Sequence, residues 1–297
     1  MRVLNFGSLN LDYVYQVDHF VRPGETLSST SRAVKHGGKG LNQSIALARA
    51  GANVSHAGCI GEGGEPLKAA LERDGVDTSH LLRVEEMQGH TFIQVNREGE
   101  NCILLYGGSN QCVSEAQIAE TFADCSAGDW LVLQNEINNL PAIVDAAFAR
   151  GMVIALNPSP YDARLDAVDF GKLSWLLVNE VEAGQISGSD DPEAAWAWLH
   201  ARYPRLSVLI TLGSAGSMAY RVEGGAVETA RQEAFRVKAV DTTAAGDTFT
   251  GFFLAGISGG MPIPDALRRA AFASSIAVSR KGAADSIPTA DEVSRAE

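Results

Sequence analysis

The sequence predicts an α/β protein with a mostly parallel sheet, helices on both of its faces, and a small antiparallel sheet inserted into it. Short apolar runs alternate with helical patterns through most of the 297 residues, and this alternation is typical of parallel βαβ units. Two stretches, 11–34 and 90–106, instead show alternating strand patterns and turn residues with no helix between them, which predicts antiparallel strands. Because no internal repeat or linker interrupts the chain, we expect one domain over residues 1–297.

Each expected parallel strand is a short apolar run that leads into or out of a helical pattern. These runs are residues 3–7, 54–60, 130–134, 153–156, 175–178 and 208–211. The inserted strands are recognised by their turns, Arg22-Pro23-Gly24 and Glu98-Gly99-Glu100. A last strand is expected over 235–240, where apolar residues alternate.

The composition excludes several classes of partner. The chain has 24 basic and 36 acidic residues, a net charge of −12, which argues against nucleic acid or an anionic membrane as its main partner. The four cysteines include no C-x-x-C pair, so neither a zinc site nor a disulfide framework is indicated, and reduced thiols in a cytosolic protein are the default. The first residues read as a strand and no apolar run could span a membrane, so we expect a soluble, cytoplasmic protein.

The most informative segment covers residues 241–251. It reads as a turn of small residues followed by a helix whose buried face carries Phe249, Phe252 and Phe253. The unpaired N–H groups of such a turn and the positive end of the helix dipole favour an anion. Asp247, beside this anion site, would take a proton from a hydroxyl that attacks phosphorus. The alternative is that Asp247 is only a helix N-cap.

A second cluster, Gly37-Gly38-Lys39-Gly40-Leu41-Asn42-Gln43, precedes a helix expected over 43–50. Glycines let the backbone approach a ligand closely, and Lys39 and Asn42 add polar donors on the same side. The cluster is not a P-loop, and the chain has neither a protein-kinase H-R-D motif nor a dinucleotide-binding G-x-G-x-x-G motif after a strand.

The two clusters, in this order and about two hundred residues apart, resemble the two signatures of the ribokinase-like (PfkB) carbohydrate kinases. Five further segments resemble motifs of that family in the same order: residues 7–12, 134–136, the N-x-x-E motif at 179–182, the nucleotide loop at 211–216, and 280–286. The resemblance covers about residues 3–288. It implies a kinase fold in which the inserted strands close over a sugar as a lid and exclude water. In this family such lids often pair between subunits, so it also implies a homodimer.

The resemblance assigns the roles of the candidate residues. The catalytic loop would be Ala244, Ala245, Gly246 and the base Asp247. Sugar-binding residues would be Asn10, Asp12, Gly38, Lys39, Asn42, Glu136 and Asp247. Nucleotide-binding residues would be Asn179, Thr211, Gly213, Ser214, Gly216, Ala245 and Gly246. ATP, Mg²⁺ and K⁺ are the implied cofactors: Asn179 and Glu182 would act on magnesium through its waters, and the monovalent cation would be held by Asp241, Thr243, Ala277, Gly282 and Ser286.

The acceptor side suits a neutral polyol better than a sugar phosphate. A phosphate would want an arginine cluster in the lid, yet residues 90–106 offer only Arg97, beside Glu98 and Glu100. The leading hypothesis is therefore an ATP-dependent kinase that acts on the primary hydroxyl of a small sugar, most simply D-ribose. A nucleoside or other sugar kinase is the alternative within the family, although only Phe92 and Tyr106 are obvious aromatic lid residues. A non-catalytic sugar-sensing protein is the alternative outside the enzymes, and the presence of Asp247 after Gly246 argues against it.

Two positions depart from the family pattern. Ala244 replaces the first glycine of the family's G-A-G-D, which is harmless if its φ is negative and awkward otherwise. Ala271 stands where the family commonly places an asparagine near the adenine, which leaves strict adenine recognition open.

Overall fold

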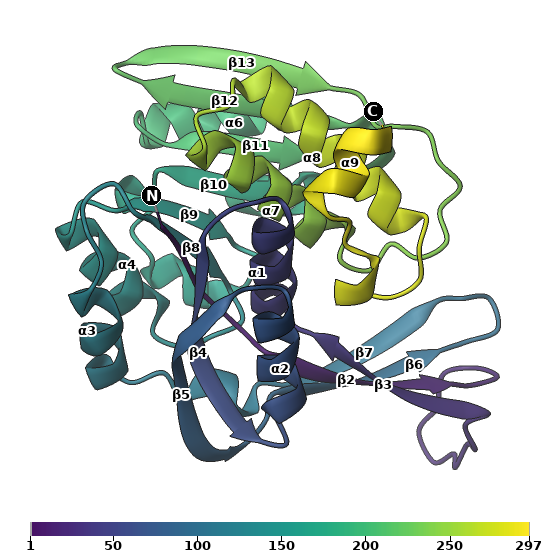
Figure 1. Ribbon diagram of the computed structural model, residues 1–297. Coiled ribbons are helices and arrows are strands. Elements are labelled where there is room, and N and C mark those ends of the chain that lie inside the picture. The colour runs from purple at the N-terminus through teal and green to yellow at the C-terminus, as the bar shows by residue number, and fades with distance from the viewer. Residues whose placement is uncertain (1, 297) are drawn as a thin grey trace.

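The computed structural model describes residues 2–296, and its main feature is a nine-stranded sheet (Figure 1). Seven neighbouring strands pair in parallel. From one edge inwards they are β5 (Asp77–Met87), β4 (Val54–Glu62), β1 (Val3–Phe6), β8 (Trp130–Gln134), β9 (Val153–Asn157), β10 (Trp175–Asn179) and β11 (Ser207–Thr211). Antiparallel β12 (Ser217–Glu223) and β13 (Ala226–Gln232) complete the other edge. The expected mostly parallel sheet is confirmed, including all six of its predicted parallel strands.

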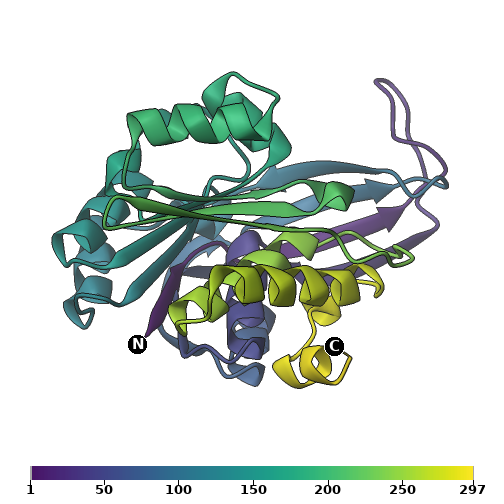
Figure 2. The same cartoon turned by 90° about the horizontal axis from the view of Figure 1, so that it is seen from above.

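Helices cover both faces of this sheet (Figure 2). One face packs against α1 (Lys39–Arg49), α2 (Glu65–Arg73), α7 (Ala245–Ser258), α8 (Ile263–Val278) and α9 (Ala290–Ala296), and the other against α3 (Glu115–Ala123), α4 (Leu140–Ala149), α5 (Glu180–Ser187) and α6 (Pro192–Arg202). Strands in the middle of the sheet supply both layers, because successive side chains point to opposite faces: Val3 lies in the first core and Leu4 in the second. Within residues 2–296, no helix has the length and apolar character needed to cross a membrane.

The second sheet, which we call the lid sheet, contains four strands in the order β3-β2-β6-β7. Its strands are β2 (Asn10–Gln16), β3 (Ser31–Gly37), β6 (His90–Val95) and β7 (Asn101–Tyr106). The inserted sheet is confirmed, with one detail that the sequence did not predict: its outer pairs are antiparallel, but β2 and β6 pair in parallel. The reason is that β2 follows β1 and β6 follows β5, so both leave the main sheet from the same ends of parallel strands. Figure 1 shows the lid sheet projecting from one edge of the molecule.

Two local expectations were wrong. Residues 235–240 form no strand, since β13 ends at Gln232 and the chain then crosses α8 in an irregular segment, where the Phe235 ring packs edge-on against Phe272 at 5.0 Å between centroids. The apolar residues that alternate in this segment include Phe235, which packs against α8, so the alternation does not mark a strand here. The first helix starts at Lys39 instead of residue 43, because Gly38 adopts φ 93° and turns the chain directly from β3 into α1.

Candidate active site

The predicted residues meet at the carboxyl edge of the parallel strands, where open α/β sheets bind ligands. Asp247 lies in the first turn of α7, and Asn42 comes from α1, which packs against α7. Glu136 follows β8, and Asn179 ends β10. Asp12 lies inside β2 of the lid sheet, and it is near enough to Glu136 for the charge of that carboxylate to act on it.

Asp247 is buried, with 7% of its surface exposed. Its Oδ2 accepts a hydrogen bond from Asn42 Nδ2 at 2.9 Å, and its Oδ1 accepts one from Gln43 Nε2 at 2.9 Å. The N-cap interpretation is wrong, because Ala244 occupies the N-cap position and, among the described residues, no side chain caps this helix. Asp247 therefore bonds across to α1 and does not cap α7; the Ala245 N–H donates to the Thr242 carbonyl at 3.3 Å, and the N–H groups of Gly246 and Asp247 are left for another acceptor.

The acceptor-side groups are held in place by neighbours. Glu136 Oε2 accepts hydrogen bonds from the Lys39 backbone N–H, at 3.0 Å, and from the Ser8 hydroxyl. Asn10 Oδ1 accepts one from Asn110 Nδ2 at 2.8 Å. These bonds fix each side chain while leaving further lone pairs for hydroxyl groups.

Asp12 sits in an unusual environment for a carboxylate. Burial raises its pKa to about 6; the Thr91 hydroxyl, 2.6 Å from Asp12 Oδ1, opposes the shift, and the charge of Glu136 adds to it. A side chain at Gly37 would collide with it, because an added Cβ would lie 1.9 Å from Asp12 Oδ2. The site therefore holds a carboxylate that is ionised at neutral pH but takes up a proton under mildly acidic conditions.

Lys39 links the two halves of the site. Burial opposes the charge of its ammonium group, but the carboxylates of Asp247, Glu136 and Glu182 outweigh burial and raise its pKa. Glu182 is itself buried and forms a capping box with Asn179: the Asn179 Oδ1 accepts from the Glu182 N–H at 2.8 Å, and Glu182 Oε2 accepts from the Asn179 N–H at 3.1 Å. A lysine that stays protonated among three carboxylates is suited to meet a transferring phosphate.

A cavity of about 780 Å³ adjoins the start of α7. It brings together most of the predicted nucleotide residues, Thr211, Gly213, Ser214, Gly216, Ala245 and Gly246, and Ala271 lies in its wall. Asn179 is the neighbour of Thr211 across β10 and β11 rather than a lining residue. Phe235 and Val237, from the segment mistaken for a strand, supply apolar wall. The volume fits a small organic ligand such as a nucleotide.

The predicted cation segments also meet. Asp241 Oδ2 accepts a hydrogen bond from the Gly282 N–H at 3.0 Å, and its Oδ1 accepts two from Thr243. Ala277 lies in the last turn of α8, and the Ser286 hydroxyl is buried and donates to the Ala283 carbonyl.

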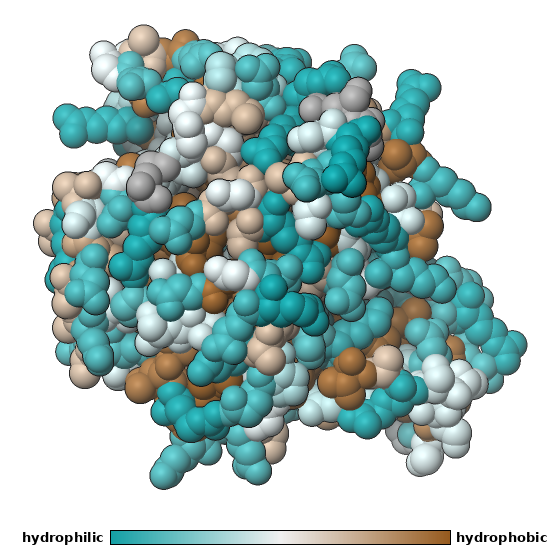
Figure 3. All heavy atoms as spheres, viewed as in Figure 1, coloured by the Kyte–Doolittle hydropathy of each residue, from teal (hydrophilic) through white to brown (hydrophobic). Residues whose placement is uncertain are grey.

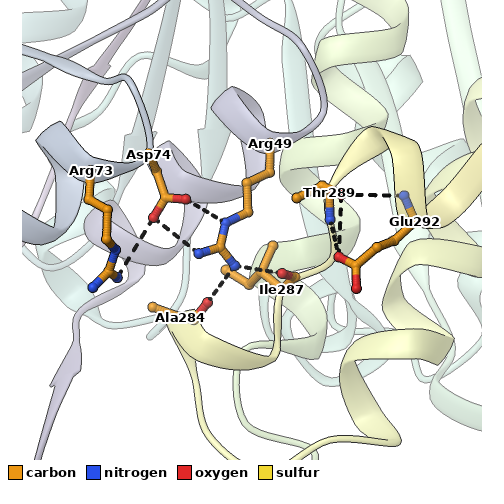
Figure 4. Close-up of polar contacts among 7 residues, drawn as sticks. All are labelled: Arg49, Arg73, Asp74, Ala284, Ile287, Thr289 and Glu292. Carbon is orange, nitrogen blue, oxygen red and sulfur yellow. Dashed lines mark hydrogen bonds and ion pairs between the residues drawn. The ribbon is translucent and has the colours of Figure 1, made fainter.

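Arg49 links residues 284–287, the segment that contains Ser286, to the rest of the fold through hydrogen bonds (Figure 4). Its guanidinium donates to both oxygens of Asp74, at 2.7 and 3.1 Å, and to the carbonyls of Ala284 and Ile287, at 3.0 and 2.6 Å. The same arginine thus joins the end of α1, the end of α2 and the C-terminal segment.

The sequence did not single out three residues that shape the site. Asn110 donates a hydrogen bond to Asn10, Thr91 donates one to Asp12, and Gln43 donates one to Asp247. Gln43 could have been found, since it directly follows Asn42 in the glycine cluster. Asn110 carries no local signal, because it lies in a short 3₁₀ turn about one hundred residues from its partner.

A buried carboxylate at a helix start, near a cluster of polar side chains and beside residues that line a nucleotide-sized cavity, suits a small-molecule kinase. Residues 2–290 match the model of the pfkB family of carbohydrate kinases. The chain therefore belongs to this family, and it is a phosphotransferase that acts on a sugar hydroxyl.

Individual relatives extend this result. The ribokinase of Haemophilus influenzae is 36% identical over 296 residues, covering 96% of this chain and 95% of the relative. Two solved structures are similar along nearly their whole length. Ribokinase from Cryptococcus neoformans var. grubii in complex with ADP has 35% identity and a TM-score of 0.84, with 100% of this chain and 99% of that one covered. Arabidopsis thaliana ribokinase complexed with ribose and ATP has 27% identity and a TM-score of 0.87, with 99% and 97% covered.

Proposed function

We propose that this chain transfers the γ-phosphoryl group of ATP to the primary hydroxyl of D-ribose, and that the whole chain acts as one kinase domain. The observation that carries the proposal is the position of Asp247: it is buried at the start of α7, directly after the cavity residues Ala245 and Gly246, and its charge and that of Glu136 both act on Lys39. Similarity to ribokinases, one of them solved with ribose and ATP, supports the choice of both substrates.

In this proposal each part of the site has one task. Asp12, Glu136 and Asn10 bind sugar hydroxyls and present one of them to Asp247. Asp247 takes the proton from that hydroxyl as it attacks the γ-phosphorus. The N–H groups of Gly246 and Asp247, and the Lys39 ammonium, stabilise the negative charge on the phosphoryl oxygens; the Ala245 N–H would join them only by giving up its 3.3 Å bond to the Thr242 carbonyl.

Magnesium would be held near Glu182 and Asn179. The fit is reasonable, because Glu182 is a buried carboxylate that uses Oε2 for its capping bond to Asn179 and keeps a second oxygen for a metal-bound water. When bound, the ion would neutralise charge on the nucleotide phosphates.

A monovalent cation such as K⁺ would lie between the 241–243 and 277–286 segments. Asp241, Thr243, Ala277, Gly282 and Ser286 offer carbonyl and hydroxyl oxygens with one carboxylate, which suits a large, weakly hydrated ion. Rates measured in K⁺, Na⁺ and a bulky organic cation at equal ionic strength test this site. Activity that is indifferent to the exchange would exclude it.

A screen of ADP release across pentoses, hexoses and nucleosides tests the proposed substrates. We expect the highest kcat/KM with D-ribose and a much lower value with 2-deoxyribose, since a missing hydroxyl leaves a half-buried carboxylate, which the closed lid would shield from water, without its partner at a cost of roughly 1–3 kcal/mol. A nucleoside as the best substrate would favour the alternative within the family. Equal values for ribose and 2-deoxyribose would contradict the assigned sugar site.

A further inference from the structure

Gln43 is a buried residue of α1 whose side-chain amide is used completely within the protein. Its surface exposure is 0%. Its Nε2 donates to Asp247 Oδ1 at 2.9 Å and makes a longer contact of 3.4 Å with Asn157 Oδ1. Its Oε1 accepts from Gln134 Nε2 at 2.7 Å. The amide therefore bridges the carboxylate of α7 and the end of β8.

A chain of buried polar groups fixes the orientation of this amide. Gln134 Nε2 also donates to Asn5 Oδ1 at 3.0 Å, and Asn5 Nδ2 donates to the Ser44 hydroxyl at 2.7 Å. Because the Gln43 oxygen must face the N–H of Gln134, its NH₂ group must face Asp247. Rotating the amide would break bonds at both ends in a region without water access.

The hydrogen-bonded side chains that fix Gln43 are all uncharged. The last of these side chains is His56, whose Nδ1 lies 2.8 Å from the Ser44 hydroxyl. Burial lowers the pKa of His56 to about 4, so the ring is neutral at physiological pH. The charged groups around Asp247 are Lys39 at the start of α1 and, beyond Lys39, Glu136 and Glu182. A neutral donor orients a carboxylate without the large loss of basicity that a cation in the same place would cause.

Asn42 differs from Gln43 in one respect. Its Nδ2 also donates to Asp247, but its buried Oδ1 has no hydrogen-bond partner anywhere in residues 2–296. Of the two amides on Asp247, one therefore keeps an unused acceptor, whereas the other has both its oxygen and its NH₂ group bonded within the protein.

We propose that Gln43 is a positioning residue for phosphoryl transfer: it holds the Asp247 carboxylate at the angle that points its remaining lone pairs at the acceptor hydroxyl. The inference depends on the proposed role of Asp247 as the base. The competing explanation is that Gln43 only satisfies buried polar groups, in which case its loss would lower stability and leave the chemistry unchanged.

The test compares Gln43→Met and Gln43→Glu with Gln117→Met. Gln117 is the matched control, because it is a buried glutamine that donates to the Gly58 carbonyl and accepts from Cys59 on the other side of the sheet. For Gln43→Met we expect kcat to fall about tenfold or more, since small misplacements of a reacting group are costly, while the KM for sugar changes by less than about threefold. Gln117→Met should lower the melting temperature comparably and keep kcat.

Gln43→Glu adds a second measurement, the pH dependence of the rate, which should not change if Gln43 only stabilises the fold. A second carboxylate against Asp247 raises the pKa of the base, so the acid limb of the kcat profile, measured at saturating D-ribose so that titration of Asp12 does not contribute, should shift upward by about one pH unit or more. The inference is overturned if Gln43→Met keeps the kcat of Gln117→Met or if the Gln43→Glu profile coincides with that of the wild type. Asp247→Asn in the same assay separates the two proposals: full activity there would remove Asp247 as the base, whereas an inactive Asp247→Asn beside an active Gln43→Met would reject Gln43 alone.

Discussion

At the residue scale, the site depends on side chains whose surroundings change their chemistry. Asp12 is the clearest case, since a carboxylate with a pKa of about 6 can lose its charge under mild conditions. Ala244 is the second, because it has φ 61° and ψ 10°, a left-handed conformation that costs a residue with a Cβ roughly 1–2 kcal/mol. The first residue predicts a pH dependence, and the second a stabilising substitution.

Sugar binding should weaken as the pH falls through the pKa of Asp12. Above about pH 6 the group is ionised and accepts hydroxyl bonds; below it, protonation removes an acceptor. If only the ionised form binds, the sugar dissociation constant should rise by about tenfold per pH unit well below the pKa and be flat above pH 7. Calorimetric titration with D-ribose between pH 4.5 and 7.5 measures this. Asp12→Asn is the control, which should bind D-ribose weakly and lose this pH dependence. If the dissociation constant of the variant depended on pH in the same way as that of the wild type, another group would be responsible for the titration.

Ala244→Gly should stabilise the protein. Glycine reaches positive φ without strain, and this gain of about 1–2 kcal/mol is partly offset by the greater freedom of glycine in the unfolded chain, so a net gain of about 0.5–1 kcal/mol is expected. Urea denaturation with an unchanged m-value measures it. The matched control is Ala245→Gly, at the next position in the helix, where the same replacement should be neutral or destabilising. Equal effects at both positions would contradict strain at residue 244.

At the element scale, α1 is the helix that organises both ends of the protein. Its first residues meet the site, and its close contact with α7 depends on Gly251, where an added Cβ would lie 2.4 Å from the Ala46 Cβ. Its last residue, Arg49, fastens Asp74 and the C-terminal segment (Figure 4). A disturbance at Arg49 can therefore reach the segment that carries Gly282 and Ser286.

Arg49→Met should destabilise the protein by about 3 kcal/mol. The Arg49 and Asp74 side chains are only 16% and 12% exposed, so the substitution leaves a mostly buried carboxylate with its main partner removed. Arg73→Met is the matched control: Arg73 lies 3.9 Å from the same carboxylate but is 59% exposed, and its loss should cost less than about 1 kcal/mol. Chemical denaturation of both variants gives the comparison. Similar decreases in the free energy of unfolding for the two variants would show that the bidentate hydrogen bonds of Arg49 add no stability beyond an exposed ion pair.

At the scale of the whole molecule, the lid sheet is too apolar to be fully solvated. β7 exposes apolar side chains on both of its faces, including Ile103 at 55% and Leu104 at 69%, and Phe92 on β6 is 44% exposed. Figure 3 shows that the face of the molecule seen in Figure 1 is mainly hydrophilic, with apolar patches that include one over the lid sheet. Large exposed apolar areas commonly mark protein contacts, and we therefore propose that two lids pair, as the family resemblance implies.

A homodimer through the lid should dissociate when the lid surface becomes charged. We expect sedimentation velocity to show a dimer for the wild type at micromolar concentration and a shift toward monomer for the Ile103→Lys/Leu104→Lys double variant, which changes one residue on each face. Val227→Lys, at an exposed valine of β13 outside the lid sheet, should leave the dimer intact. A monomeric wild type, or a double variant that stays dimeric, would contradict pairing through the lid.

The sequence by itself determined the features that depend on local periodicity and backbone chemistry. The six parallel strands, the helix with Phe252 and Phe253 buried, the inserted strands and the carboxylate of Asp247 at a helix start could all be predicted, because each is encoded within a few neighbouring residues. The family signatures followed for the same reason.

The tertiary structure alone decided how distant segments meet. Gln43 and Asp247 are 204 positions apart, and Asn110 and Asn10 are 100 apart, so no local pattern announces their bonds. The parallel pairing of β2 with β6 and the irregular path of residues 235–240 likewise depend on what lies beside them. Periodicity indicates which side of an element is buried, but only packing determines which polar group a buried amide or carboxylate faces, and this choice gives Asp247 its orientation and Asp12 its shifted pKa.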